Sequence, residues 1–299
     1  MSDLERTILT LITYYDIFDY PLSLIEVWLW GYKLDARCKV LDVVELLQRL
    51  ADKIEEKDGF YFLRGREELV SLRQERRNFG VEKWKKSLGV VKILRFVPFV
   101  RMIALCNNNG FLHTKKDSDI DLFIIVSGGR LWLARFLITL VTQIMGVRRY
   151  GRKIDNRICL SFYITDEALN IKKFYDKNNM YLYQWMNLIA PIFDVDKTYR
   201  RFFLENEWIK IFLPKAREWW IPESGVIRDS EWSRKARRFF EIFFSGWAGS
   251  PFLRKIQLKR MMRNKDSAIH EDNDKVVVND RVMKFHERAL PEYRPDSFI

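Results

Sequence analysis

Two aspartates separated by one residue begin a strongly apolar stretch near the middle of the chain. Asp119 and Asp121 lead into Leu122-Phe123-Ile124-Ile125-Val126, which is typical of a buried β-strand. Alternate side chains of a strand point to the same face, so the two carboxylates should project together. Paired carboxylates bind hard cations such as Mg²⁺ or Mn²⁺ with substrate phosphates, and such ions assist in-line displacement at phosphorus. The spacing therefore predicts phosphoryl or nucleotidyl transfer, although short acidic triplets also occur on solvated strand ends.

The residues before this stretch strengthen the prediction. Residues 100–105 form a second strand-like run, and a polar loop joins it to Ser118-Asp119-Ile120-Asp121-Leu122. This order resembles the nucleotidyltransferase superfamily that includes DNA polymerase beta and the antibiotic nucleotidyltransferases. Residues 15–21, 57–62, 98–102 and 158–160 also resemble a prokaryotic group of that superfamily. The resemblance implies an α+β fold, a mixed sheet with flanking helices, and Mg²⁺- or Mn²⁺-dependent transfer of a nucleoside monophosphate from an NTP to an acceptor.

The superfamily holds the terminal phosphates with a Gly-Ser pair between the two strands. Here Asn107 and Asn108 occupy those positions, and Asn109 and Gly110 follow. Asparagine tolerates left-handed backbone, and its side-chain amide donates hydrogen bonds. We therefore expect Asn107, Asn108, Asn109 and Gly110, with Ser118, to form a modified nucleotide-binding loop.

A third carboxylate usually completes such a catalytic site from a neighbouring strand. The expected strand, residues 157–164, contains no acidic residue, and Asp155 just before it is the best candidate. The alternative is that Asp155 is a loop residue paired with Lys153 or Arg157, because surface charges often pair without consequence. The predicted catalytic residues are thus Asp119, Asp121 and Asp155, with Asp119 and Asp121 as the metal ligands.

Five regions follow from the patterning of the chain. They are a winged-helix-like domain (1–65, three helices and an Asp-Gly hairpin), a helical connector (66–97), the nucleotidyltransferase-like core (98–168), a helical bundle (169–222), and a basic, aromatic helical extension with a tail (223–299). In the tail, residues 275–278 are expected to form a strand and 281–286 a short helix. The third helix of the first domain carries charges of both signs, which favours an interaction role over sequence-specific DNA binding.

Composition limits the remaining possibilities. The 299 residues carry a net charge of +12 and are 48% hydrophobic, enough for several packed cores. Residues 131–147 are apolar, but they are few for a membrane span and include Arg135. We therefore expect a buried helix that packs against the sheet, and we expect no transmembrane segment. The N-terminal residues lack a cleavable-signal pattern, and the three cysteines are far apart. We expect a cytoplasmic protein.

The positive charge is concentrated in the C-terminal region. Residues 231–263 hold nine lysines and arginines against Glu231 and Glu241, interleaved with aromatic residues. Residues 234–263 could contact nucleic acid, or lie on an anionic membrane surface, or form two amphipathic helices that bury their aromatic side chains. Because Asn107 and Asn108 stand where the superfamily has Gly-Ser, a second interpretation of the whole protein stays open. In it, the chain is a catalytically degenerate nucleotidyltransferase fold that acts as a nucleic-acid- or protein-binding module.

Overall fold

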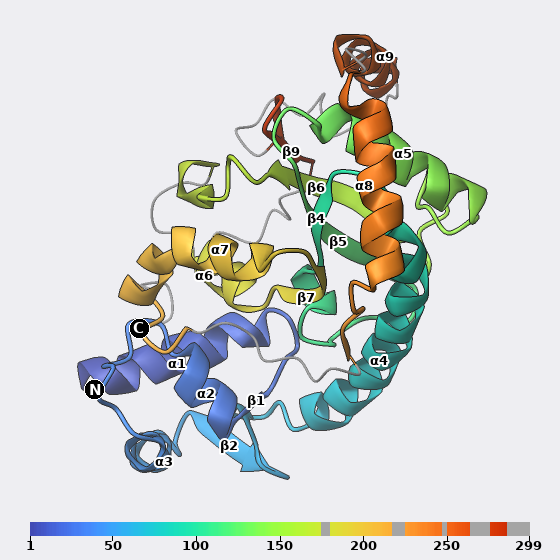
Figure 1. Ribbon diagram of the computed structural model, residues 1–299. Helices are drawn as coiled ribbons and strands as arrows, with labels where there is room; N and C mark the ends of the chain where they lie inside the picture. Colours follow the sequence, from blue (N-terminus) through green and yellow to red (C-terminus); the bar gives the residue numbers. More distant parts are fainter. Residues whose placement is uncertain (175–179, 217–224, 247–249, 264–275, 286–299) are drawn as a thin grey trace.

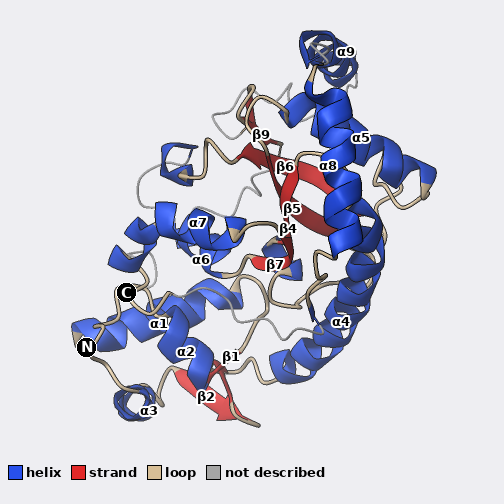
Figure 2. Cartoon of the chain, in the orientation of Figure 1, coloured by secondary structure: helices blue, strands red, loops and turns tan. Residues whose placement is uncertain are grey.

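The computed structural model of this protein describes residues 1–174, 180–216, 225–246, 250–263 and 276–285. In these residues a mixed β-sheet lies at the centre with helices on both faces, and a smaller sheet belongs to a helical N-terminal unit (Figure 1, Figure 2). The α+β class expected from the sequence is confirmed.

The central sheet has the strand order β7-β4-β5-β6-β9-β8. Its strands are β4 (Val100–Leu105), β5 (Ile120–Val126), β6 (Ile158–Thr165), β7 (Ala190–Asp194), β8 (Val277–Val278) and β9 (Val282–Lys284). Strands β5 and β6 run parallel and are connected through α5 (Leu131–Ile144), whereas the other neighbouring pairs are antiparallel. The strands predicted around residues 100–105, 120–126 and 157–164 are therefore confirmed.

Every residue of β5 is buried, because helices cover both faces of the sheet. Leu122 and Ile124 belong to the core shared with α4 (Glu68–Leu94) and α5. Phe123 and Ile125 belong to the opposite core, with α6 (Met180–Asn187) and α7 (Thr198–Glu205). By alternation, Asp121 shares the face of Phe123. The strand thus directs this carboxylate away from α4 and α5.

The region 169–222, expected to be entirely helical, requires a correction. Helices α6 and α7 and the 3-10 helices η2 (Ile171–Phe174) and η3 (Glu207–Ile211) are present, but Ala190–Asp194 forms β7 at the edge of the central sheet. Pro191 lies within this strand, and an edge strand tolerates a proline because one side of it needs no ladder hydrogen bond. The helical prediction was wrong for these residues.

The N-terminal unit has the three helices and the hairpin expected from the sequence. These are α1 (Asp3–Asp16), α2 (Leu24–Trp30), α3 (Val40–Arg49), β2 (Ile54–Lys57) and β3 (Phe60–Leu63), and β1 (Leu22–Ser23) pairs with β3. Asp58 and Gly59, between β2 and β3, both have positive φ, as a tight hairpin turn requires. The long helix α4 then leads to the central sheet and confirms the helical connector (Figure 1).

Two further helices, α8 (Glu231–Ser245) and α9 (Ser250–Arg263), confirm the helical character of the basic region. Charged groups hold α8 to the body. Arg237 donates a hydrogen bond of 3.0 Å to the backbone oxygen of Arg95, and Glu241 accepts one of 2.7 Å from Arg101. The aromatic side chains of α8 are mostly outside the core: Phe239 is 65% and Phe243 70% exposed. The alternative in which α8 buries its aromatic residues is therefore wrong.

The tail also differs from the expectation. Residues 282–284, predicted as part of a short helix, form β9, because their backbone pairs with β6 over Phe162–Ile164. His286, at the end of that predicted helix, lies outside the described residues, as do residues 287–299. Among the helices that the structure describes, none has the length and apolar character needed to cross a membrane.

Candidate metal and nucleotide site

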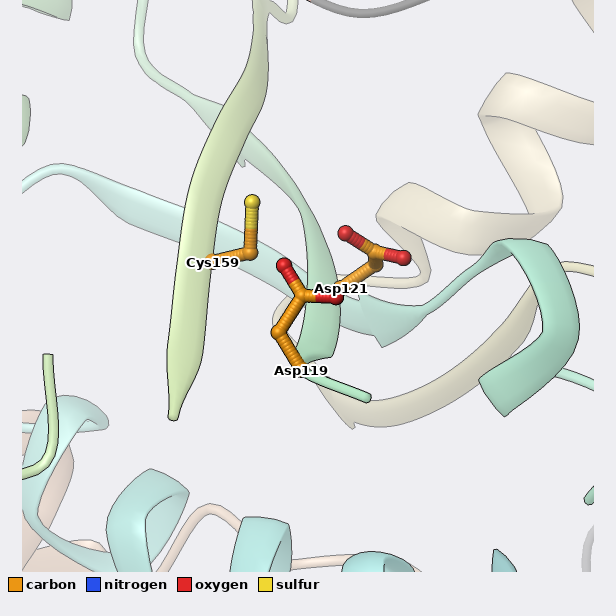
Figure 3. Close-up of side chains that lie close together, drawn as sticks. All are labelled: Asp119, Asp121 and Cys159. Atoms are coloured by element: carbon orange, nitrogen blue, oxygen red, sulfur yellow. The ribbon is translucent and has the colours of Figure 1, made fainter. Parts of the chain in front are cut away.

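Asp119 and Asp121 lie together where β5 begins. Asp119 directly precedes the strand, and Asp121 pairs with Cys159 of the parallel strand β6. One carboxylate oxygen of each aspartate and the Sγ atom of Cys159 all lie within 4.8 Å of one another (Figure 3). Each aspartate is only 9% exposed, so a cation held here would be largely shielded from water. The structure thus brings together the two residues expected to bind metal.

Cys159 is the member of this group that the sequence did not suggest as a ligand. Burial raises the pKa of its thiol well above the usual value, and the charges of Asp121 and Asp119 raise it further. A protonated thiol is a poor ligand for a hard ion, which prefers oxygen. The two carboxylates are therefore the donors of this group that suit a hard divalent cation.

Arg149 lies directly against the carboxylates. Its guanidinium donates a hydrogen bond to Oδ2 of Asp119 and lies 3.8 Å from Sγ of Cys159. Burial by itself lowers the pKa of Arg149. The charges of Asp119 and Cys159 and the hydrogen bonds to both residues outweigh burial, so the pKa of Arg149 is raised. Arg149 therefore stays charged and neutralises Asp119. A metal ion would have to compete with it for Oδ2.

The asparagine loop contacts both aspartates. Asn107 has a φ of 52°, in the left-handed region that asparagine tolerates. Its amide donates a 3.0 Å hydrogen bond to Oδ2 of Asp121, and its own Oδ1 accepts one of 3.1 Å from the Tyr181 hydroxyl. Tyr181 in α6 thereby fixes which way the amide faces, and the amide orients Asp121.

The remaining loop residues have different surroundings. Asn109 is buried and donates to the backbone oxygen of Asp119 at 3.4 Å, whereas Asn108 lines a small cavity beside Tyr14 and Phe111. Gly110 packs so closely on the residue that follows α6 that an added Cβ would lie 2.0 Å from the backbone oxygen of Leu188. A glycine is therefore required here for close packing.

A buried lysine fixes the start of the acidic segment. Lys83 of α4 is 2% exposed and donates hydrogen bonds to Oγ of Ser118 at 2.6 Å and to its backbone oxygen at 2.8 Å. Burial lowers the pKa of Lys83, while the charges of Asp155, Asp119 and other aspartates oppose that shift. Ser118 is thus anchored to α4. Asp155 is an exposed residue near Lys83 and is not a member of the carboxylate–thiol group.

Sequence reasoning therefore missed three residues that contact the predicted site: Lys83, Arg149 and Tyr181. They come from α4, from the segment before β6 and from α6, so only the folded chain brings them to β5.

Comparison with models of protein families, with curated proteins and with solved structures found no match for this chain. Its function must therefore be inferred from the geometry of the site.

Proposed function

We propose that this protein is a metal-dependent nucleotidyltransferase that moves a nucleoside monophosphate from an NTP to an acceptor. The proposal rests on one observation: the carboxylates of Asp119 and Asp121 lie close together and are largely buried at the start of a buried strand. The resemblance of residues 100–122 to the nucleotidyltransferase superfamily agrees with this chemistry. Three free cysteines support the cytoplasmic location expected from the sequence.

In this proposal the carboxylates hold Mg²⁺ or Mn²⁺, which supplies positive charge at the reacting phosphates. The chain's own residues prepare the site. Asn107 orients Asp121, and Lys83 fixes Ser118 next to Asp119. Asn108 and Gly110 belong to the predicted nucleotide-binding loop. Their backbone amides and the asparagine side chains are the donors available to phosphate oxygens.

We also propose that residues 1–65 form a winged-helix-like unit with an interaction role. Three helices and a three-stranded sheet in the order β1-β3-β2 support the fold. The exposed side of α3 includes Leu41 and charges of both signs, such as Asp42 and Arg49, which fits a protein surface better than a DNA backbone.

A second candidate function is a catalytically inactive nucleotidyltransferase fold that binds nucleic acid or protein. The ion pair between Arg149 and Asp119 favours it, because the guanidinium occupies a carboxylate oxygen that a cation would need. Asp155 does not complete the cluster as a third carboxylate, which points the same way.

Titration of the purified protein with each NTP, with and without Mn²⁺, distinguishes the two candidates. The nucleotidyltransferase should bind at least one NTP more tightly with Mn²⁺, and an Asp119→Asn/Asp121→Asn variant should lose this metal-dependent gain. Asp117→Asn is the matched control, since Asp117 is an exposed aspartate of the same segment. If the wild-type protein shows no metal-dependent binding, the inactive fold is the better assignment.

A further inference from the structure

A cavity of about 820 Å³ lies between α5, α9 and the segment that precedes β6. Arg149 and Cys159 belong to both its wall and the carboxylate group. Five arginines line it, namely Arg135, Arg148, Arg149, Arg152 and Arg260, and no aspartate or glutamate of the described residues does. The cavity is therefore positively charged.

Four of these arginines lack a carboxylate partner among the described residues: Arg135, Arg148, Arg152 and Arg260. Arg135 donates to the Gln257 amide oxygen at 2.6 Å, and its Nε is buried with no hydrogen-bond partner in the described structure. Burial lowers the pKa of Arg135 to about 10, and the charges of Arg148 and Arg260 add to that effect. Holding like charges together under burial is costly unless an anion compensates them.

Apolar side chains line the same cavity. They include Phe136, Leu140, Leu160, Ile256, Met261 and Phe285. Leu140 and Ile256 are 44% and 45% exposed, a high fraction for side chains of this type in a cavity. A ligand covering them would remove apolar surface from water, which is favourable. The cavity thus combines cationic groups with apolar side chains.

We propose that this cavity binds a phosphate monoester that carries a hydrocarbon tail. The arginines would take the head group, because guanidinium groups match phosphate oxygens in pairs and a phosphate dianion offsets more than one positive charge. The tail would lie on Leu140, Ile256 and Phe136. Inorganic phosphate would leave these apolar side chains exposed, and an uncharged amphiphile would leave the charges of the arginines uncompensated.

This ligand is also placed to be the acceptor of the proposed transfer, a step that rests on the proposed function. An oxygen of its phosphate would form a bond to the α-phosphorus of the NTP as the bond from that phosphorus to the β-phosphate oxygen breaks. Pyrophosphate leaves, and the product is a nucleoside diphosphate esterified to the hydrocarbon chain. Binding itself requires no chemistry at Asp119 or Asp121.

Calorimetric titration with dodecyl phosphate, below its micelle-forming concentration, tests the site. We expect it to bind about tenfold more tightly, or better, than inorganic phosphate, dodecyl maltoside or dodecanoate, because each comparator lacks one of the two interactions or carries a weaker head group. Equal binding of any of these comparators would overturn the proposal.

Matched variants locate the binding. Arg148→Gln/Arg260→Gln should weaken dodecyl phosphate binding by at least about tenfold, whereas Arg263→Gln, from the same helix but outside the cavity, should not. Leu140→Gln should weaken it, and Ile144→Gln, one turn further along α5 and outside the cavity, should not. Equal losses in a variant and its control would contradict the site. The Asp121→Asn variant removes a predicted metal ligand and leaves the Arg149–Asp119 pair in place, so it should retain dodecyl phosphate binding. Failure of the transfer reaction and failure of this site are therefore distinguishable.

Discussion

At the scale of single residues, Arg149 sets the state of the predicted metal site. It pairs with Asp119, whose side chain is 12% exposed, while the Arg149 side chain is 32% exposed. Removing Arg149 would leave the Asp119 carboxylate without this partner. Replacing it removes both the competitor for a cation and the partner of a buried charge.

We predict that Arg149→Gln raises the affinity for Mn²⁺ by about tenfold in the absence of nucleotide and lowers stability by about 1–3 kcal/mol without metal. Electron paramagnetic resonance titration of Mn²⁺ and thermal unfolding measure the two effects. Arg157→Gln is the control, because Arg157 donates to the backbone oxygen of Gly146 and not to an aspartate. An unchanged Mn²⁺ affinity in Arg149→Gln would show that the ion pair does not compete with metal.

His113 gives a second prediction at this scale. Its ring is 1% exposed, and Nε2 lies 2.8 Å from the Arg76 guanidinium, which also donates to the Phe18 backbone oxygen. Burial and the charge of Arg76 lower the pKa of His113 from 6.5 to about 3. Between these pH values the unfolded chain binds a proton that the folded protein does not, so stability is lost as the pH falls.

At pH 5 this loss is about 2 kcal/mol relative to neutral pH. Urea denaturation at pH 7 and pH 5 should show the decrease in the wild-type protein, and His113→Gln should show a decrease smaller by about that amount. The comparison uses each protein's own change between the two pH values, which removes any constant cost of the substitution. The same decrease in both proteins would rule out His113 as its source.

At the scale of elements, α4 connects the N-terminal unit to the site and contains two glycines with opposite surroundings. A Cβ at Gly80 would lie 2.5 Å from the backbone oxygen of Leu112, whereas nothing lies within 4 Å of a Cβ at Gly89. Alanine favours a helix over glycine by about 1 kcal/mol where space allows.

We therefore predict that Gly89→Ala stabilises the protein by about 0.5–1 kcal/mol and that Gly80→Ala destabilises it by about 1–3 kcal/mol. Chemical denaturation of the two variants measures both values. Each glycine acts as the control for the other, because they share one helix and one substitution. Stabilisation by Gly80→Ala would mean that the segment around Leu112 yields easily.

The central elements were predictable where a local pattern decides them. The apolar runs of β4 and β5 and the alternation in β6 are visible in the sequence, as is the Asp-Gly turn between β2 and β3. Strand β7 was missed because Pro191 and its short length argue against a strand unless its edge position is known. Lys83 and Arg149 were missed because their partners are distant in the sequence, so no local spacing reveals them.

At the scale of the whole molecule, the N-terminal unit and the body share a core. Met180 and Leu188 pack in the cluster that contains Leu11 and Trp30. Between the two parts, Gln184 accepts a hydrogen bond from the Tyr15 hydroxyl at 2.9 Å and donates to the backbone oxygen of Trp30 at 3.0 Å. The unit is thus built into the structure by shared burial and by paired polar groups.

We predict that Gln184→Leu destabilises the protein by about 2–4 kcal/mol, because it leaves the Tyr15 hydroxyl and the Trp30 carbonyl buried without partners. Adding Tyr15→Phe should recover part of that loss, since it removes one unpaired group. Urea denaturation of both single variants and the double variant measures this coupling. Strictly additive losses would contradict a direct bond between the two side chains.

The position of β9 has a consequence for synthesis of the chain. Strand β6 ends at Thr165, but its partner β9 begins at Val282, so more than a hundred residues leave the ribosome before the two can pair. Until then the backbone of Phe162–Ile164 is an unpaired edge that can join strands of another molecule. Folding of the central sheet therefore cannot be completed before β9 has been synthesised. A chain that stops short of Val282 would carry Asp119 and Asp121 on a sheet with an open, association-prone side.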